Sequence, residues 1–283
     1  MATDYLLSGL RAVVVGATGC IGSETVRYLA ACGAQVVAVG RSSEALAEVA
    51  PVCASALNVE LSSPMFGTLV ADAVERTLGG VDLVVNAAGG LGSIGPTRAM
   101  GAADLLSQFT IGVAASAELV RACGRLLDQS GSPSVVLFSG GGSTDVFPRF
   151  TPYAIDKVAT VRYVENLAAE EPRWKVNAVA PGFVVSNIHQ ATFSAGQERA
   201  GDYHQETIRR IETGGVPPAK AARLVAFLGS SVSEGISGRL ISAPWDDWES
   251  ETGRTAWRES SSLGRLRRID RQWFTAVSKD RAQ

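Results

Sequence analysis

The sequence predicts an α/β fold: a doubly wound parallel sheet of about seven strands with helices on both faces. Strand-like and helix-like segments alternate from residue 11 to residue 243, a pattern typical of parallel strands joined by crossover helices. The strand segments are continuous runs of valine, isoleucine and alanine, as expected where helices cover both faces of a sheet. With 46% hydrophobic residues among 283, the chain can build one large core.

Each predicted strand is a short apolar segment bounded by turn-forming residues. The strands are expected at residues 11–16, 35–40, 52–59, 81–86, 134–139, 174–180 and 239–242. Helices are expected between them, at residues 21–32, 64–78, 102–127, 153–170 and 219–228. No internal repeat or linker interrupts this series, so residues 1–243 are predicted to form one domain.

Two segments break the alternation. Residues 183–215 are long, mixed in character and poor in strong periodicity, which favours a lid over a binding site. Residues 244–283 contain four tryptophans, Trp245, Trp248, Trp257 and Trp273.

In this tail Leu263, Leu266, Ile269 and Trp273 recur at helical spacing. We expect an amphipathic arm that packs on its own domain or on a sister subunit. The alternative is that one of the tryptophans contacts substrate, because buried aromatic side chains serve both cores and interfaces.

Charge, hydropathy and cysteine content argue against several classes of protein. The formal net charge of −2 gives no support to a nucleic-acid partner. The longest apolar runs are too short to cross a bilayer, and the N-terminus lacks the pattern of a secretion signal. Four cysteines without a Cys-x-x-Cys pair favour a reduced cytoplasmic protein. The two histidines, His189 and His204, have no cysteine neighbours, so no metal site is expected.

A glycine-rich turn joins the first predicted strand to the first helix. Gly16, Gly19 and Gly22 follow a Gly-x-x-Gly-x-x-Gly spacing. Such a turn lets the backbone approach a pyrophosphate, whose charge then lies at the helix N-terminus. A simple tight turn is the alternative, but the position at the first strand favours a dinucleotide site.

The end of the second strand bears on the choice of dinucleotide. Arg41, Ser42 and Ser43 follow Gly40, and no carboxylate stands there. A guanidinium and hydroxyls suit a ribose 2′-phosphate, whereas an acidic residue would suit the free 2′-hydroxyl. NADP(H) is therefore expected rather than NAD(H), with a solvated surface arginine as the alternative.

Four further motifs follow in order: Asn86-Ala87-Ala88-Gly89, Ser139, Tyr153-x-x-x-Lys157 and Asn177-x-x-x-Pro181-Gly182. Together with the glycine turn, the chain resembles the short-chain dehydrogenase/reductase family over about residues 8–243, with an atypical C-terminal tail. The resemblance implies a Rossmann-type core, nicotinamide-dependent chemistry between carbonyl and alcohol, and a homodimer or homotetramer.

The spacing of Tyr153 and Lys157 places both on one face of a helix. A nearby ammonium favours the phenolate and lowers the pKa of a tyrosine. The resemblance implies that Tyr153 passes a proton to the carbonyl oxygen, that Lys157 tunes it and holds the nicotinamide ribose, and that Ser139 hydrogen-bonds the substrate oxygen.

The resemblance also implies which residues contact the cofactor. Gly16, Thr18, Gly19 and Ile21 would line the pyrophosphate, and Asn58 and Val59 the adenine. Asn86, Ala87 and Gly89 would lie by the adenosine ribose, and Pro181, Gly182, Val184 and Ser186 would face the carboxamide.

The sequence departs from the family pattern at four places. Cys20 replaces a glycine, and Phe109 stands where an active-site asparagine is expected. Ser139 lies 14 residues before Tyr153, while Gly140 has the commoner spacing and Ser143 is the alternative serine. The usual Asp-Gly-Gly ending is replaced by residues 243–246, Ala-Pro-Trp-Asp.

The function predicted from these residues is NADP(H)-dependent interconversion of a carbonyl and a secondary alcohol. The residues leave its direction open, although a preference for NADP(H) would favour ketone reduction in cells. The glycine spacing leaves open an epimerase or dehydratase that oxidises its substrate transiently. Phe109 leaves open a dinucleotide-binding protein without turnover. The substrate itself stays open, since the predicted lid carries both polar and aromatic side chains.

Overall fold

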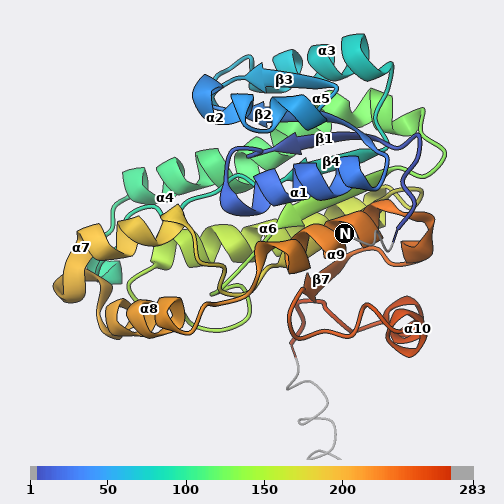
Figure 1. Cartoon of the computed structure of the whole chain (residues 1–283). Coiled ribbons are helices and arrows are strands. Elements are labelled where there is room, and N and C mark those ends of the chain that lie inside the picture. The colour runs from blue at the N-terminus through green and yellow to red at the C-terminus, as the bar shows by residue number, and fades with distance from the viewer. Residues whose placement is uncertain (1–4, 269–283) are drawn as a thin grey trace, which may run out of the picture.

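The computed structural model describes residues 5–268 and contains one parallel seven-stranded sheet (Figure 1). Its strands run in the order β3-β2-β1-β4-β5-β6-β7, the doubly wound order that reverses between β1 and β4. The strands are β1 Arg11–Val15, β2 Gln35–Gly40, β3 Ser55–Asn58, β4 Leu83–Asn86, β5 Ser134–Phe138, β6 Lys175–Ala180 and β7 Arg239–Ser242. The predicted fold class is confirmed.

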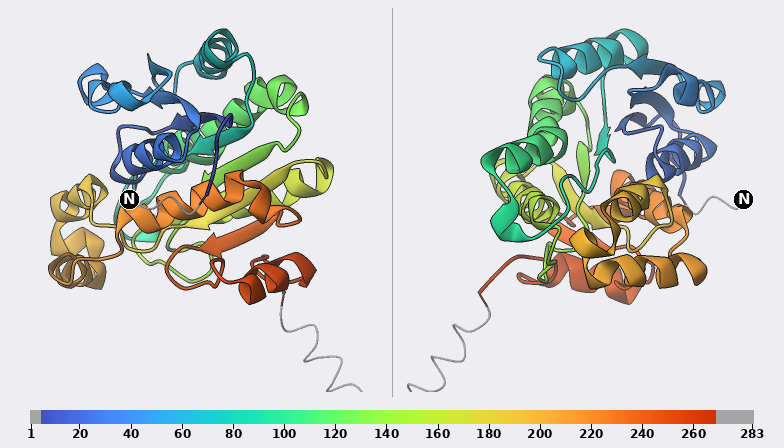
Figure 2. Two further views of the ribbon diagram at one scale, coloured as in Figure 1. Left: turned by 45° about the vertical axis from the view of Figure 1, so that its right-hand side comes forward. Right: turned by 90° about the vertical axis from the view of Figure 1, so that its left-hand side faces the viewer.

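Helices cover both faces of the sheet (Figure 2). One face packs against α1, Cys20–Ala31, and α9, Pro218–Gly229; the other packs against α3, Phe66–Leu78, α5, Ala115–Asp128, and α6, Thr151–Glu170. Successive strand residues point to opposite sides, so Val14 joins the core under α1 while Val13 joins the core under α5. The shorter elements are α2 Ser43–Ala47 and 3-10 turns at Ala50–Val52, Thr97–Ala99, Asn187–His189 and Ser231–Ser233.

The single helix predicted over residues 102–127 is wrong, because it is divided. Helix α4, Ala102–Phe109, passes through a π-helical turn at Thr110–Ala114 before α5 begins. Gly112 is non-helical there, with φ −102° and ψ −108°. A β-carbon at Gly112 would lie 2.0 Å from a carboxylate oxygen of Asp156 on α6, so only glycine lets the two segments approach this closely.

The segment predicted as a lid contains two helices that the sequence pattern did not predict. They are α7, Gln190–Ala200, and α8, Asp202–Glu212, which project beyond the carboxyl edge of the sheet (Figure 1). Gly196, with φ +67°, interrupts α7, and this break accounts for the weak helical periodicity.

The C-terminal tail returns to the edge of the sheet. After α10, Glu251–Glu259, the Gly264 carbonyl accepts a hydrogen bond of 2.7 Å from the Leu240 amide of β7. Trp248 and Trp257 are buried in the core under α1 and α9. The helix expected from the spacing of Leu263 and Leu266 is wrong at these two residues, since residues 260–268 are not helical. The other two residues of that pattern, Ile269 and Trp273, lie outside the described residues.

Candidate active site

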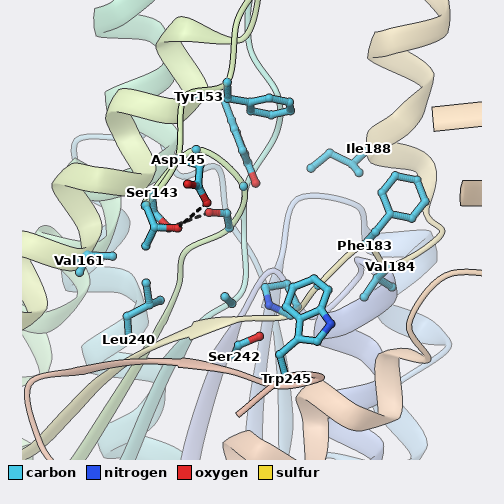
Figure 3. A pocket seen from close by; sticks show the side chains of 18 of the residues that line it. Ser143, Asp145, Tyr153, Val161, Phe183, Val184, Ile188, Leu240, Ser242 and Trp245 are labelled. Carbon is cyan, nitrogen blue, oxygen red and sulfur yellow. Dashed lines mark hydrogen bonds between the residues drawn. The ribbon is translucent and has the colours of Figure 1, made fainter. Parts of the chain in front are cut away.

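A cavity of about 510 Å³ lies at the carboxyl edge of the sheet. Its walls come from the loop after β5, the first turn of α6, the loop after β6, helix α8 and the start of the tail. Tyr153, Ser143, Phe183 and Trp245 surround it in Figure 3. This is the edge at which ligands bind in open parallel sheets.

Tyr153 and Lys157 come from the first turns of α6 and lie together. The Lys157 Nζ atom is 5.3 Å from the centre of the Tyr153 ring and donates a hydrogen bond of 3.2 Å to the Phe138 carbonyl at the end of β5. Tyr153 lines the cavity. The structure therefore brings together the phenol and the ammonium that the sequence pattern paired.

The environment of this pair differs from the expectation in one respect. Burial raises the pKa of the Tyr153 hydroxyl far above its usual value, and Tyr203 and Asp156 raise it further. Burial also lowers the pKa of the Lys157 ammonium, which the Asp156 carboxylate partly opposes. The protein surroundings of Tyr153 therefore favour its protonated phenol over the phenolate.

The three candidate positions before Tyr153 lie differently around its hydroxyl. Ser139 is buried, and its hydroxyl donates a hydrogen bond of 3.2 Å to the Lys157 carbonyl rather than lining the cavity. A β-carbon at Gly140 would lie 2.5 Å from the Tyr153 hydroxyl. Ser143 lines the cavity and donates a hydrogen bond of 2.8 Å to the Gly140 carbonyl.

The glycine turn after β1 closes tightly on its surroundings. Gly16 has φ +79°, and a β-carbon there would lie 2.5 Å from the Ala88 amide nitrogen. A β-carbon at Gly22 would lie 2.0 Å from the Gly16 carbonyl oxygen. Gly19 caps α1 without a side-chain hydrogen bond, so the amides of the first helical turn are available to an anion.

Three other residues of the turn connect it with its neighbours in the fold. Thr18 lies beside Gly40, because a β-carbon on that glycine would be 2.7 Å from the threonine methyl group. Ile21 lines the cavity. The Cys20 thiol, 3.7 Å from the Val185 carbonyl, connects the turn with the loop after β6.

The residues predicted around the adenosine lie at the ends of β2 and β3. Arg41 is exposed, and the Ser42 hydroxyl caps α2 by accepting a hydrogen bond of 3.2 Å from the Ala45 amide. Gly40 pairs with Asn58, and the Val59 amide donates a hydrogen bond of 3.0 Å to the Gly40 carbonyl. The adjacent strands β2 and β3 thus bring Arg41 and Ser42 to the same carboxyl edge of the sheet as Asn58 and Val59.

Asn86 is buried and shapes the loop that follows β4. Its amide nitrogen donates a hydrogen bond of 2.8 Å to Ser116, and its oxygen accepts one of 3.1 Å from the Ala88 amide. The Ala87 amide donates to the Val15 carbonyl. A β-carbon at Gly89 would be 3.7 Å from Lys157 Nζ, so this loop reaches the ammonium of the candidate catalytic pair.

The loop after β6 contributes Pro181, Gly182, Val184 and Ser186 to the cavity wall. His189, which the sequence reasoning did not assign to the site, anchors this loop: its ring stacks on Phe183 with 4.3 Å between centroids. Its Nε2 lies 3.0 Å from the Val184 carbonyl and must carry the proton, since a carbonyl only accepts.

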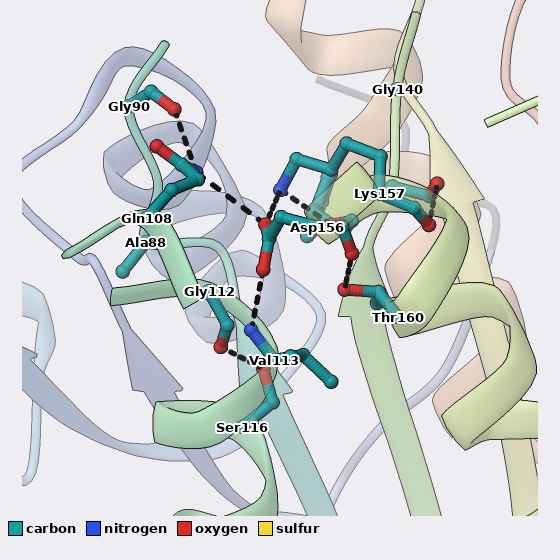
Figure 4. Close-up of polar contacts among 12 residues, drawn as sticks. Ala88, Gly90, Gln108, Gly112, Val113, Ser116, Gly140, Asp156, Lys157 and Thr160 are labelled. Atoms are coloured by element: carbon teal, nitrogen blue, oxygen red, sulfur yellow. Dashed lines mark hydrogen bonds and ion pairs between the residues drawn. The ribbon is translucent and has the colours of Figure 1, made fainter. Parts of the chain in front are cut away.

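A second group that the sequence reasoning missed is Asp156 (Figure 4). Its carboxylate is fully buried, 3.5 Å from Lys157 Nζ, and accepts a hydrogen bond of 2.8 Å from the Val113 amide of the π turn. The Gln108 amide lies 3.5 Å away. Phe109 is half-buried, and it is the neighbouring Gln108 that approaches Asp156. The sequence held no signal for Asp156, because consecutive helical residues such as 156 and 157 do not normally face each other.

Within residues 5–268, no group of three or more His, Cys, Asp or Glu side chains could hold a metal ion. In the same part of the chain, no helix is both long and apolar enough to span a bilayer.

Comparison with known proteins places this site in context. A family model described as short chain dehydrogenase matches residues 11–197. The chain is 26% identical over 243 residues to 7alpha-hydroxysteroid dehydrogenase of Escherichia coli K12, covering 83% of this chain and 92% of that protein. It is 28% identical over 246 residues to gluconate 5-dehydrogenase of Gluconobacter oxydans, covering 84% and 94%.

Solved structures agree with this match. A short chain dehydrogenase from Salmonella enterica serovar Typhi superposes with a TM-score of 0.73 at 25% identity, over 86% of this chain and 99% of that one. A structure from Shigella flexneri 2a complexed with NADP gives a TM-score of 0.72 at 24% identity, over 84% and 98%. The chain therefore belongs to the short-chain dehydrogenase/reductase family.

Proposed function

We propose that this protein is an NADP(H)-dependent oxidoreductase that interconverts a ketone and a secondary alcohol, with Tyr153 as the acid and base. The observation that carries the proposal is the position of Tyr153 and Lys157 at a cavity on the carboxyl edge of the sheet. The glycine turn lies on the same edge, so a dinucleotide held by its pyrophosphate there can extend to the cavity.

The chemistry assigned to the chain is proton transfer and orientation. A bound nicotinamide supplies or accepts the hydride. Tyr153 donates its hydroxyl proton to the carbonyl oxygen during reduction and removes it from the alcohol during oxidation. The Lys157 ammonium stabilises the phenolate that reduction leaves behind. Since burial favours the protonated phenol, ketone reduction is the proposed direction near neutral pH.

We assign the hydroxyl that holds the substrate oxygen to Ser143 rather than Ser139. Ser143 lines the cavity, while the Ser139 hydroxyl donates its hydrogen bond to the Lys157 carbonyl of α6. Gly140, between them, faces the Tyr153 hydroxyl without a side chain, which leaves space for a substrate oxygen beside the phenol.

The preference for NADP(H) over NAD(H) rests on Arg41 and Ser42. Arg41 is exposed at the end of β2, next to the Ser42 that caps α2, where its guanidinium can pair with a 2′-phosphate. The related Shigella structure was solved with NADP. A cytoplasmic homodimer or homotetramer remains a prediction; a sequence with only four cysteines and no Cys-x-x-Cys pair is compatible with a reducing compartment.

A second candidate function, nicotinamide binding without turnover, is favoured by one observation. Phe109 stands where the family resemblance leads us to expect an active-site asparagine, and the contacts to the Asp156 carboxylate come instead from Gln108 and the Val113 amide. Against it, both members of the acid-base pair are present and in contact.

Turnover with a panel of ketones tests the proposal. The panel should include cyclic ketones of steroid type, keto sugar acids and β-keto thioesters, followed by loss of the reduced-nicotinamide absorbance with NADPH and with NADH. We expect net oxidation of NADPH with at least one class. Tight NADPH binding without any turnover would favour the second candidate, and product formation with retained, recycled cofactor would favour an epimerase.

A further inference from the structure

The buried carboxylate of Asp156 is unusual for its position in a helix. Residues that follow each other in an α-helix point about 100° apart, yet Asp156 and Lys157 form an ion pair of 3.5 Å. Both are almost fully buried. A buried charge is costly unless it is paired and hydrogen-bonded, so the arrangement needs a reason outside α6.

The reason lies in the π turn between α4 and α5. The Val113 amide donates a hydrogen bond of 2.8 Å to Asp156 Oδ1, and Gln108 Nε2 lies 3.5 Å from Oδ2. Gln108 is itself anchored to the Gly90 carbonyl at 3.1 Å. The missing side chain of Gly112 provides the space for the carboxylate. Two segments more than 40 residues apart in the chain thus combine to hold one carboxylate against one ammonium (Figure 4).

We propose that Asp156 is a positioning residue whose carboxylate fixes Lys157 Nζ and balances its charge, so that Tyr153 stays protonated and poised to donate during ketone reduction. This inference rests on the proposed role of Tyr153 as the proton donor. Lys157 Nζ has a second fixed contact, the Phe138 carbonyl at 3.2 Å. These two acceptors hold the ammonium over the Tyr153 ring.

The charges around Tyr153 determine the sign of the effect. From α6 it faces Lys157 and Asp156, and from α8 Tyr203. The other titratable groups that line the same cavity are Asp145, His189, Arg210, Asp246 and Arg265. The side chains and amides contributed by the π turn and α4 to Asp156 are uncharged. The Asp156 carboxylate itself raises the pKa of Tyr153, so removing its negative charge lowers that pKa.

The test is a spectroscopic titration of Tyr153 that needs no substrate. Tyrosinate absorbance is followed against pH in the full-length wild-type protein and in Asp156→Asn, each corrected by its Tyr153→Phe counterpart. We expect Tyr153 to remain protonated to at least pH ~10 in the wild type and its pKa to fall by about one unit or more in Asp156→Asn. Glu170→Gln, an exposed change of equal charge at the end of the same helix, should leave the Tyr153 titration in place.

The outcomes separate this inference from the proposed function. A lowered Tyr153 pKa in Asp156→Asn supports the charge balance even if no ketone is reduced. An unchanged pKa overturns it even if turnover is found. If Asp156→Asn does not fold, the wild-type curve decides: ionisation of Tyr153 below about pH 9 would contradict the inference. With a substrate in hand, Asp156→Asn should also move the pH profile of alcohol oxidation to lower pH, a change that loss of packing alone would not produce.

Discussion

The two ends of the candidate site use glycine in different ways. On the cofactor side, Gly16 and Gly22 are required because the backbone of the turn folds back on itself. On the proposed catalytic side, Gly112 and Gly140 are required because the side chains of Asp156 and Tyr153 occupy the space a β-carbon would need. The first pair forms a motif that can be recognised by its spacing, whereas the second pair has meaning only once the neighbours in space are known.

The sharpest way to test the catalytic side is to replace Tyr153 by phenylalanine. We expect turnover to fall by about 10²–10⁴-fold, the range typical of a lost acid-base group, while NADPH binding stays within about twofold. Steady-state rates and a fluorescence titration of NADPH measure the two effects. Equal turnover by the variant would remove Tyr153 from the mechanism.

The cofactor side is tested by Arg41→Ala. Loss of a charge-assisted contact with the 2′-phosphate should weaken NADPH binding by about 10–100-fold, or about 1.4–2.8 kcal/mol. NADH serves as the control ligand, because it lacks that phosphate. Parallel weakening of both cofactors would contradict the assignment.

The catalytic-side glycine is tested by Gly112→Ala. Its β-carbon would overlap the Asp156 carboxylate, so we expect the free energy of unfolding to fall by about 1–3 kcal/mol, as for overpacking. Gly131→Ala is the matched control, since nothing lies within 4 Å of a β-carbon there. Urea unfolding of both variants gives the comparison, and equal stability would mean that α4 and α6 can move apart without cost.

The smallest effect is expected from the serines. Ser143→Ala should lower kcat by about tenfold or less, the amount for one neutral hydrogen bond, with a smaller change for Ser139→Ala. A larger loss in Ser139→Ala, with unchanged stability, would reverse the assignment.

The parts of the fold that the sequence predicted are those with strong local patterns. Strands β2 and β7 have the predicted bounds, because glycine, serine and apolar runs mark their ends. The π turn and α7 were not predicted. In the first case a contact from Asp156 overrides helical periodicity, and in the second Gly196 interrupts it.

In the candidate site, too, the residues linked by a local sequence pattern were predicted and those linked only by tertiary contacts were not. Tyr153 and Lys157 are linked by a four-residue spacing and were found together. Asp156 accepts its hydrogen bond from the distant Val113 amide, and His189 contacts the Val184 backbone carbonyl. No spacing in the sequence reveals either contact. The choice between Ser139 and Ser143 depends on which way a loop turns after β5, and that direction is a tertiary property.

The most direct measurement of the central claim is a crystal structure of the protein with NADP bound. The account predicts that the nicotinamide ring lies in the cavity within contact of Tyr153, with Lys157 on its ribose and the pyrophosphate over the turn from Gly16 to Gly22. A nicotinamide placed outside the cavity, or a Tyr153 side chain directed away from it, would contradict the account.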